Sequence, residues 1–360
     1  YDLQNVPEGL NDVVAVAAEG EHSLALKADG TLVSWGYNGN NLDVVPLTPT
    51  EVSFSIPCDA NGSYPGIAES VYDCSGVCDG ELSYDDCNFC GGPDSDYVCE
   101  CNDDSCSLEC TGEENCLGLC GDVTDEICLA QNNSNLIVSG AYHSYGIKSD
   151  KTLVGWGRDN NGESTIPQDL NEVIDAAGGQ YHGVALTSDG NVSAWGWNAY
   201  GQTNVPDSLS NVVSVSAGYY HTLALKEDGT IVGWGLDDYN AISGSLNLTD
   251  IVAIDAGDHR HSLAITKEGT VKAWGYSPNG EIDVPLNLSD VVQVSAGYHS
   301  SFALKSDGTV VGWGWDGYNI LDIPEDLSDV VAIDVGYWHA LALKSDGTVV
   351  TWGWDGYDLD

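Results

Sequence analysis

Short apolar segments recur along the chain in a fixed order. In the last unit, residues 330–334 form a largely β-branched run, residues 340–344 alternate Ala with Leu and end in Lys, and residues 348–352 follow a Ser-Asp-Gly sequence. Such runs are typical of strands. Gly347 can adopt the left-handed conformation that closes a hairpin. The pattern predicts three clear strands per unit, and no stretch of the chain repeats with a helical period.

A Trp-Gly pair closes each unit and sets the period of the chain. From the second pair onward the spacings are 39, 39, 40, 39 and 39 residues, whereas the first gap is 121 residues. A constant period of this size is typical of repeat architectures, and seven such units fit a β-propeller. We therefore predict an all-β, seven-bladed β-propeller. The tryptophans of the pairs are Trp35, Trp156, Trp195, Trp234, Trp274, Trp313 and Trp352.

The segment after each Trp-Gly pair is expected to form a weaker, fourth strand at the outer edge of the blade. It usually ends in a proline eleven residues after the tryptophan. Proline suits an edge strand or its exit turn because it cannot donate to a ladder. These prolines are Pro46, Pro167, Pro206, Pro285 and Pro324.

The two ends of the sequence resemble each other. Residues 357–360 read Tyr-Asp-Leu-Asp and residues 1–4 read Tyr-Asp-Leu-Gln, so both match the slot that precedes Pro7 in the repeat. We expect the N-terminal segment to complete the blade that the C-terminal segment starts. Exchange of this strand with a neighbouring molecule is the alternative.

One insertion interrupts the repeats, and it holds all twelve cysteines. The expected domains are residues 1–46 as a first blade, residues 47–134 as a cysteine-rich acidic insertion and residues 135–360 as six further blades. Apolar residues are sparse in the insertion, so we expect disulfides to replace a core and the segment to be largely irregular. Cysteines used in this way indicate an oxidising compartment. The predicted disulfide residues are Cys58, Cys74, Cys78, Cys87, Cys90, Cys99, Cys101, Cys106, Cys110, Cys116, Cys120 and Cys128.

The repeat text resembles a known family. The segments GYYHTLALKEDGTIVGWG (218–235) and EHSLALKADGTLVSWG (21–36) are similar to the repeat of the regulator-of-chromosome-condensation family. They are most similar to its bacterial secreted branch, which includes a propeller-type beta-lactamase inhibitor protein. The resemblance implies a seven-bladed propeller. It implies little about function, because family members serve as exchange factors, inhibitors and surface proteins.

The charge of the chain excludes several partners. The net charge is −46, from 56 acidic and 10 basic residues. Such a surface repels nucleic acids and anionic bilayers, and no apolar run is long enough to span a membrane. The chain lacks Met and begins at Tyr1, so we expect an initiator and a signal peptide to have been removed. We therefore expect a secreted, extracellular or cell-surface protein without a nucleic-acid partner.

Calcium is a tentative ligand of the insertion, and no cofactor is expected to be required elsewhere. Carboxylates near Gly-rich turns offer the hard oxygen ligands that calcium prefers. Zinc is disfavoured there because the insertion has a single CxxC pair and no histidine. The candidate calcium ligands are Asp73, Asp79, Asp85, Asp86, Asp94 and Asp96.

A histidine recurs at one position of the repeat, with Ser300 replacing it in the sixth unit. A residue present in nearly every blade serves the blade, so we expect a structural histidine that hydrogen-bonds a neighbouring strand. The repeated tryptophan is likewise expected to pack between blades. The histidines are His22, His143, His182, His221, His261 and His339.

Aromatic residues at variable positions of the repeat are candidates for binding. One set lies two and five residues after the repeated tryptophan, in loops expected on a common edge of the ring. Aromatic side chains outside the core are typical of protein-binding and sugar-binding surfaces; the alternative is that they fill the blade junctions. The set is Tyr37, Trp197, Tyr200, Tyr239, Tyr276, Trp315, Tyr318, Trp354 and Tyr357. A second set precedes the histidine position: Tyr142, Tyr181, Tyr219, Tyr220, Tyr298, Tyr337 and Trp338.

No catalytic motif stands out, so we expect a protein that is not an enzyme. The leading functional hypothesis is a secreted structural or adhesive propeller at a cell surface, self-assembling into a filament or layer. A soluble inhibitor-like protein binder and a glycan-binding lectin are the alternatives. The partner is thus another copy of the chain, another extracellular protein or a glycan. Asn-x-Ser/Thr sequons that permit glycosylation lie at Asn61, Asn132, Asn191, Asn247 and Asn287.

Overall fold

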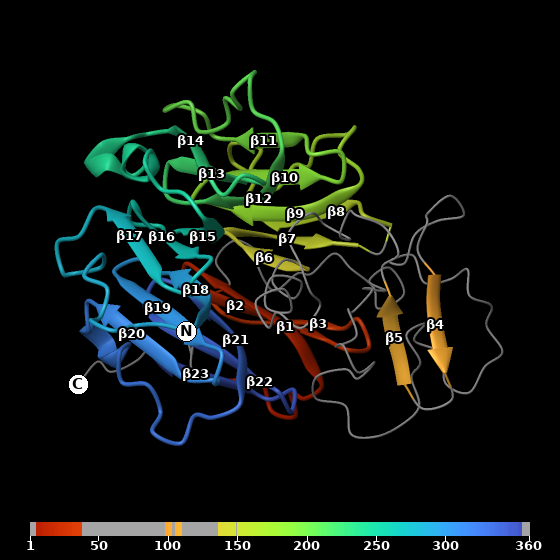
Figure 1. The fold of residues 1–360 in the computed structure, drawn as a ribbon, viewed down its shortest axis with the longest axis vertical. Coiled ribbons are helices and arrows are strands. Elements are labelled where there is room, and N and C mark those ends of the chain that lie inside the picture. The colour runs from red at the N-terminus through yellow and green to blue at the C-terminus, as the bar shows by residue number, and fades with distance from the viewer. Residues whose placement is uncertain (1–4, 38–97, 103–104, 110–135, 149, 355–360) are drawn as a thin grey trace.

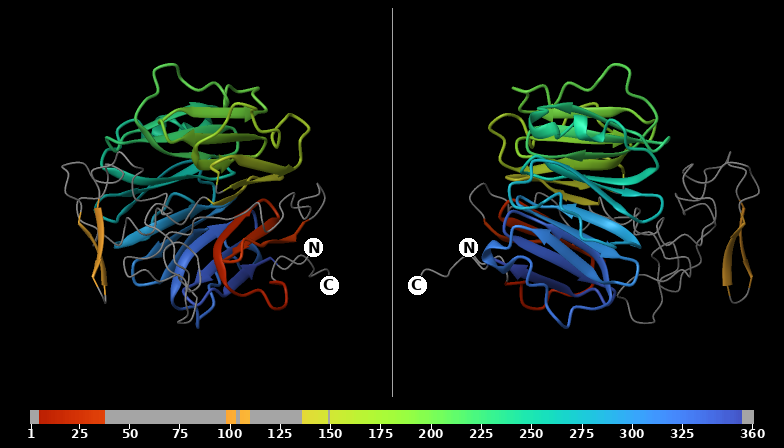
Figure 2. Two further views of the ribbon diagram at one scale, coloured as in Figure 1. Left: turned by 90° about the vertical axis from the view of Figure 1, so that its right-hand side faces the viewer. Right: turned by 60° about the vertical axis from the view of Figure 1, so that its left-hand side comes forward.

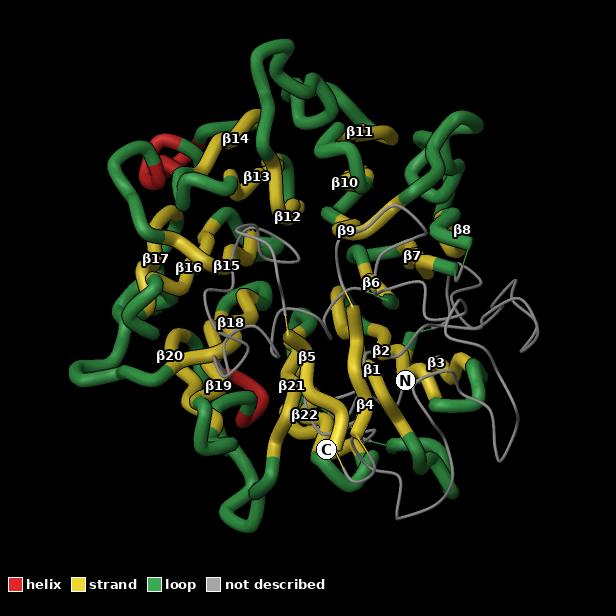
Figure 3. The backbone as a smooth tube through the Cα atoms, turned by 45° about the vertical axis from the view of Figure 1, so that its right-hand side comes forward, coloured by secondary structure: helices red, strands yellow, loops and turns green. Residues whose placement is uncertain are grey.

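The computed structural model describes residues 5–37, 98–102, 105–109, 136–148 and 150–354 (Figure 1). Seven three-stranded antiparallel sheets follow one another in sequence order around a common axis (Figure 3). The first strand of each sheet contacts the first strands of both neighbouring sheets, which places it nearest to the axis. The predicted all-β, seven-bladed propeller is confirmed.

The sheets of the ring are, in order, β1 (Val13–Glu19), β2 (His22–Lys27) and β3 (Leu32–Gly36); β6 (Ile137–Ser139), β7 (His143–Ile147) and β8 (Leu153–Gly157); β9 (Val173–Gly178), β10 (His182–Thr187) and β11 (Val192–Gly196); β12 (Val212–Ala217), β13 (His221–Lys226) and β14 (Ile231–Gly235); β15 (Ile251–Ala256), β16 (His261–Thr266) and β17 (Val271–Gly275); β18 (Val291–Ala296), β19 (Ser300–Lys305) and β20 (Val310–Gly314); and β21 (Val330–Val335), β22 (His339–Lys344) and β23 (Val349–Gly353). We number these sheets 1 to 7. Short 3₁₀ helices are η2 (Asp238–Asn240), η3 (Ser243–Ser245) and η4 (Gly317–Asn319).

The apolar core is divided among the junctions between sheets. In side view the sheets stand face to face around the ring (Figure 2). The described residues form seven buried apolar clusters, and each combines residues of two neighbouring sheets. The repeated tryptophans of sheets 2 to 7 are 5–7% exposed within them, as expected for residues that pack between blades. Each blade therefore depends on its neighbours for its core.

The prediction of four-stranded blades was wrong. In the part of the chain that the structure describes, the segment after each Trp-Gly pair contains no strand: it is a loop, with short 3₁₀ helices after β14 and β20. Its side chains capture backbone amides locally: Asp237 Oδ1 accepts from the amides of Ile242 and Ser243 at 2.8 and 2.9 Å, and Asp316 Oδ1 accepts from that of Leu321 at 3.0 Å. Such local hydrogen bonds compete with a sheet ladder, and the proline at the end of the segment removes a further donor.

The ring closes between sheets 7 and 1 with the contacts that join the other sheets. The amide of Val13 donates to the carbonyl of Gly347 at 3.1 Å, as the amide of Val291 does to that of Gly269 at 3.0 Å. The amide of Ala18 also donates to Asp334 Oδ2 at 2.8 Å. The strand slot for which the two ends of the sequence compete lies in residues outside the described ranges, so that prediction stays untested.

Buried histidines link most blades to the next. His182 Nε2 lies 2.9 Å from Thr222 Oγ1, and this hydroxyl donates to the carbonyl of Gln202 at 2.9 Å. Because the hydroxyl proton is used by the carbonyl, the imidazole must be the donor to the hydroxyl oxygen. Burial lowers the pKa of His182 to about 3, so the ring is neutral. The same pairing joins His22 to Ser144, His221 to Ser262, His261 to Ser301 and His339 to Ser23.

Two junctions depart from this pattern, and each has a compensating residue. His143 faces Gly183, which has no hydroxyl, and Tyr145 occupies the vacated space and donates its own hydroxyl to the Glu163 carbonyl at 2.5 Å. At the other junction Ser300 replaces the histidine, and the next blade has Ala340 in place of the hydroxyl residue. The expected structural role of the repeated histidine is confirmed, and its substitutions are matched across the junction.

A buried carboxylate bridges the first strands of sheets 3 and 4. Asp175 is 6% exposed, and its Oδ2 accepts from the amide of Val215 and the hydroxyl of Ser214, both at 2.9 Å. Burial raises the pKa of Asp175 to about 7 against the effect of these hydrogen bonds. Gln293 makes the equivalent bridge between sheets 6 and 7, to the amide and carbonyl of Ile333.

We predict strong coupling between Tyr145 and Gly183. Gly183→Ser alone should destabilise the protein by about 2–4 kcal/mol, because the new Cβ meets the Tyr145 hydroxyl. Tyr145→Leu alone should cost a similar amount through the cavity and the lost hydrogen bond. The double variant recreates the Leu and Ser pair of other junctions. Its loss of unfolding free energy should be smaller than the sum of the two single losses by at least about 1 kcal/mol. Chemical denaturation of the four proteins measures this; additive effects would contradict the compensation.

We also predict a pH-dependent effect of Asp175→Asn. The folded pKa of about 7 lies above the unfolded value of about 3.9, so the stability from the protonated carboxyl is lost as pH rises through 7. Because Asn does not titrate, the stability of wild type relative to the variant should fall as pH rises from about 4 to about 7, by at most about 4 kcal/mol in total. Gln293→Ala is the matched control, since it breaks a similar bridge that cannot ionise. A pH-independent difference for Asp175→Asn would contradict this prediction.

Candidate functional site

Two kinds of loop meet on one face of the ring. One joins the first and second strands of each sheet, and the other follows the Trp-Gly pair. Their aromatic rings are in contact: the centroid of Trp197 lies 5.9 Å from that of Tyr181 and 4.9 Å from that of Tyr220, and Trp315 lies 5.2 Å from Trp338. The two aromatic sets that the sequence suggested separately therefore form one surface, which we call the aromatic face.

Two arginines extend the aromatic face between blades. The Arg158 guanidinium lies 4.5 Å from the ring centroid of Tyr181, and that of Arg260 lies 5.4 Å from Tyr219 and 6.0 Å from Tyr239. Cations over aromatic rings are favourable contacts that hold both groups in place. With these two links, ring contacts run from sheet 2 to sheet 7. The members of the aromatic face are Tyr142, Arg158, Tyr181, Trp197, Tyr200, Tyr219, Tyr220, Tyr239, His259, Arg260, Tyr276, Tyr298, His299, Trp315, Tyr318, Tyr337, Trp338 and Trp354.

The aromatic face is partly packed and partly open. Tyr200, Tyr239 and Tyr318 are 47%, 54% and 52% exposed, whereas Trp197, Trp315, Tyr276 and Trp354 are half-buried among other rings. Tyr37 is half-buried, and Tyr357 lies outside the described residues. Both interpretations of these aromatics thus hold for different residues: some fill blade junctions, and three tyrosines present their rings to solvent.

A polar pair crosses the axis at the centre of the same loops. Glu19 belongs to sheet 1 and Asp258 lies in the loop between β15 and β16 of sheet 5, and these sheets are not neighbours in the ring. Burial, and next the charge of Asp258, raises the pKa of Glu19 well above its usual range. Burial raises the pKa of Asp258 to about 6 against hydrogen bonds from Glu19 and Tyr337. The two carboxyl groups are therefore coupled, and the raised pKa of Glu19 favours its protonated form.

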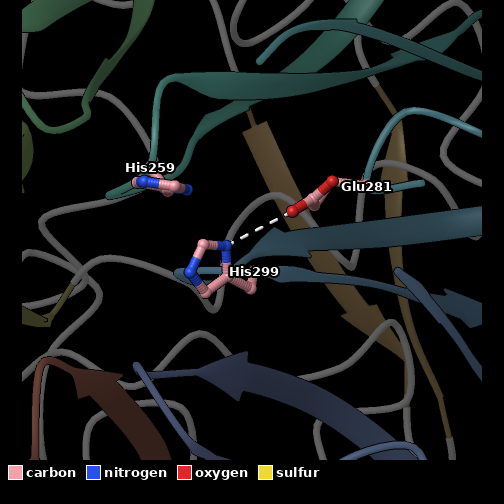
Figure 4. A group of neighbouring side chains, drawn as sticks. All are labelled: His259, Glu281 and His299. Carbon is pink, nitrogen blue, oxygen red and sulfur yellow. Dashed lines mark hydrogen bonds and ion pairs between the residues drawn. The ribbon is translucent and has the colours of Figure 1, made fainter. Parts of the chain in front are cut away.

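Three metal-binding side chains meet on the aromatic face (Figure 4). His259 lies in the loop between β15 and β16, Glu281 in the loop after β17, and His299 in the loop between β18 and β19. One ligand atom from each residue lies within 4.8 Å of the other two. Glu281 Oε1 is 3.3 Å from His299 Nδ1.

The Glu281 carboxylate is held in place and ionised. Asn279 donates to it twice at 2.8 Å, from its backbone amide and from its side-chain amide. Burial would raise the pKa of Glu281, but these hydrogen bonds, followed by the charge of His261, hold it below its usual range. The Glu281 side chain is 1% exposed, so the ionised group is nearly removed from water.

Both histidines of this group are neutral. Burial, followed by the charge of His299, lowers the pKa of His259 to about 4. Burial also lowers the pKa of His299, although its hydrogen bond to Glu281 acts in the opposite direction. A neutral imidazole is the form that binds metals.

Sequence reasoning missed these three residues, although two signals were present. The chain has eight histidines, and six of them occupy the repeat position, so His259 and His299 are the remaining pair. The single spacing of 40 residues is the second signal. It arises because three residues separate Gly257 from His261, whereas two separate Gly218 from His221. The extra residue lengthens the loop that carries His259.

The other predicted sites lie largely outside the described residues. Asn191, Asn247 and Asn287 are exposed, as glycosylation would need, whereas Asn61 and Asn132 lie outside. All six candidate calcium ligands lie outside. In the insertion the structure describes a hairpin of β4 (Val98–Asn102) and β5 (Ser105–Glu109), in which Cys101 is in register with Cys106. No disulfide of the predicted set is tested.

Among the described residues, no helix is long and apolar enough to cross a membrane. No curated protein matches the chain.

Solved structures share the fold. The ectodomain of the receptor kinase CR4 from Physcomitrella patens is 17% identical, with a TM-score of 0.54 over 97% of this chain and 75% of that one. Prp20p from Saccharomyces cerevisiae is 17% identical, with a TM-score of 0.55 over 96% and 83%, and its structure is described together with its binding to Gsp1p and histones. The CRINKLY WD40 ectodomain of the receptor kinase ACR4 from Arabidopsis thaliana is 22% identical, with a TM-score of 0.52 over 61% and 81%. At these identities the likeness shows the fold alone.

A family model described as the Regulator of chromosome condensation (RCC1) repeat matches each sheet of the ring together with most of its loops. The matched residues are 13–41, 136–163, 173–202, 212–241, 251–281, 291–320 and 330–358. These seven matches cover more than half of the sequence, and the chain therefore belongs to the RCC1 repeat family.

Proposed function

We propose that this protein is a non-enzymatic extracellular binding protein that holds another protein on its aromatic face. The observation that carries the proposal is the continuity of this face from sheet 2 to sheet 7, with Tyr200, Tyr239 and Tyr318 open to solvent. Tyrosine, tryptophan and arginine are the residues that contribute most to binding at protein interfaces. The neighbouring rings hold them in place, which lowers the entropy lost on binding.

The charge of the chain supports a basic partner. A net charge of −46 accelerates association with positively charged proteins and repels nucleic acids. The charge of Arg158 is offset by Glu163, whose Oε1 lies 3.0 Å from its Nε, and the chain has only 10 basic residues against 56 acidic ones. The yeast protein with this fold, described for its binding to Gsp1p and histones, supports protein binding as the general class.

We place this binding at a cell surface, where the protein has a structural or adhesive role. The support is the cysteine-rich, acidic insertion, whose twelve cysteines suit an oxidising compartment and whose carboxylates suit calcium. The resemblance to the bacterial secreted branch of the family points the same way. Under this proposal a second copy of the chain is one possible partner, and self-assembly is then a special case of protein binding.

Glycan binding is the second candidate, and one repeated arrangement favours it. Tyr200 stands edge-on to Trp197 with centroids 5.4 Å apart, and Tyr318 stands edge-on to Trp315 at 5.5 Å. The same pair therefore recurs in sheets 3 and 6. A half-buried indole supported by a tyrosine provides an aromatic platform on which a sugar ring can stack.

We predict that the open tyrosines are required for binding. The triple variant Tyr200→Ala, Tyr239→Ala and Tyr318→Ala should bind the partner at least about tenfold more weakly, because each substitution removes an exposed anchor. Wild type and variant would be compared in pull-downs from surface proteins of the producing cells, and the captured protein titrated at two salt concentrations. Binding to a basic partner should weaken as salt rises.

The matched control is Leu246→Ala with Leu286→Ala, which removes exposed apolar side chains that belong to no part of the aromatic face. Circular dichroism would confirm that all variants fold. Equal binding by wild type and the triple variant would overturn the proposal. Sedimentation of the purified chain distinguishes self-assembly, and a glycan array distinguishes the lectin alternative.

A further inference from the structure

We propose that His259, Glu281 and His299 form a binding site for a divalent transition metal ion of the zinc class. This site goes beyond the proposed binding function, because it stands on the geometry of three side chains at the junction of sheets 5 and 6 (Figure 4). Two imidazoles and one carboxylate are a ligand set that zinc uses in proteins, with a fourth position left for water.

The distances suit a small tetrahedral ion. Ligand atoms about 2.0–2.1 Å from zinc at the tetrahedral angle lie roughly 3.3 Å from each other. Glu281 Oε1 and His299 Nδ1 are already 3.3 Å apart. The largest separation within the group is at most 4.8 Å, so a change in the side-chain torsions of His259 brings the third ligand into range. His259 lies in the lengthened loop and is only half-buried, which leaves room for this change.

The equivalent junction between sheets 2 and 3 shows why a cation is expected here. There Glu163 is buried in the same loop position, its carboxylate accepts from the amide of Asn161 at 2.6 Å, and Arg158 Nε lies 3.0 Å from its Oε1. The residue that corresponds to Arg158 in the later blade is Tyr276, which carries no charge. Glu281 therefore has the same buried carboxylate without the arginine, and a buried carboxylate requires a compensating positive charge.

Aromatic rings and Asn279 surround the three ligands. The ring of His259 stacks on Tyr298 at 4.5 Å and stands edge-on to Tyr276 at 4.9 Å, while His299 lies 5.8 Å from Trp315. Asn279 holds the carboxylate from the opposite side, as residues behind a metal ligand commonly do. Nδ1 of His259 is buried and has no hydrogen-bond partner among the described residues, so this ring has a nitrogen free for a further ligand.

The test is cobalt(II) binding to the full chain, freed of metal by a chelator and then desalted. Cobalt(II) bound by nitrogen and oxygen in a four-coordinate site gives visible d–d absorption bands. Cobalt(II) bound by cysteine thiolates also gives sulfur-to-metal charge-transfer bands, so the two kinds of site can be told apart. We expect the d–d bands to saturate at one equivalent and to be displaced by zinc. His259→Asn and Glu281→Gln should each weaken binding at least about 100-fold, and Asn279→Ala about tenfold.

Glu163→Gln is the matched control, since it makes the same change at the equivalent loop position and should leave the bands unchanged. Thermal unfolding identifies a variant that fails to fold, and His259→Asn, in a half-exposed loop, keeps the test valid if Glu281→Gln unfolds. Charge-transfer bands alone, no bands, or equal affinities of wild type and His259→Asn would each overturn the proposal. Loss of partner binding in the tyrosine variants does not affect this result, so the two proposals fail separately.

Discussion

The ring depends on one buried hydrogen-bonded contact at the boundary between blades. The carbonyl of Gln202 accepts from the hydroxyl of Thr222 and from Nε1 of Trp234, at 2.9 and 2.8 Å, and the same hydroxyl accepts from His182 of the preceding blade. Three blade elements thus meet at one carbonyl: a histidine, a hydroxyl residue and the repeated tryptophan. An unpaired buried polar group costs about 1–3 kcal/mol, so losing one partner of this contact is costly. Where Gly183 lacks the hydroxyl, Tyr145 supplies the donor to the Glu163 carbonyl, while the ring nitrogens of His143 have no hydrogen-bond partner among the described residues.

The same contact positions the aromatic face. The carbonyl that receives the tryptophan belongs to the loop after the Trp-Gly pair, so the loops that follow sheets 2 to 6 are each held by the next blade. Glu281 illustrates the connection: its carbonyl accepts from Ser301 and Trp313, while its carboxylate faces His299. One residue therefore takes part in the scaffold through its backbone and in the candidate metal site through its side chain. Rigid support of this kind is what a binding site requires.

The fold could be predicted well from the sequence because seven units carry the same pattern of strands and turns. The strands, the hairpin glycine and the structural histidine follow from positions that nearly every unit shares; Lys151 replaces the glycine in the second unit and Ser300 the histidine in the sixth. The fourth strand failed for a local reason, since Asp237 and Asp316 capture backbone amides that a ladder would need. The candidate metal site was harder to predict because it depends on exceptions to the repeat. One unit has an extra residue before His261, and Tyr276 occupies the repeat position that Arg158 occupies in another unit. No periodicity shows that side chains from three loops converge, and the contact of Glu19 with Asp258 across the axis is equally invisible in sequence.

The histidine contact also gives the ring a direction. At five of the seven junctions one blade offers an imidazole and the next blade a hydroxyl, so these neighbouring blades join head to tail. A piece of the chain ending after sheet 4 would present His221 at its open edge, and the remaining piece would present Ser262. Such halves carry complementary edges and are suited to reassemble as separate fragments. A division between sheets 6 and 7 would separate Ser300 from Ala340 and leave no such recognition pair. The places where this propeller can be split and rejoined are thus set by the chemistry of each junction.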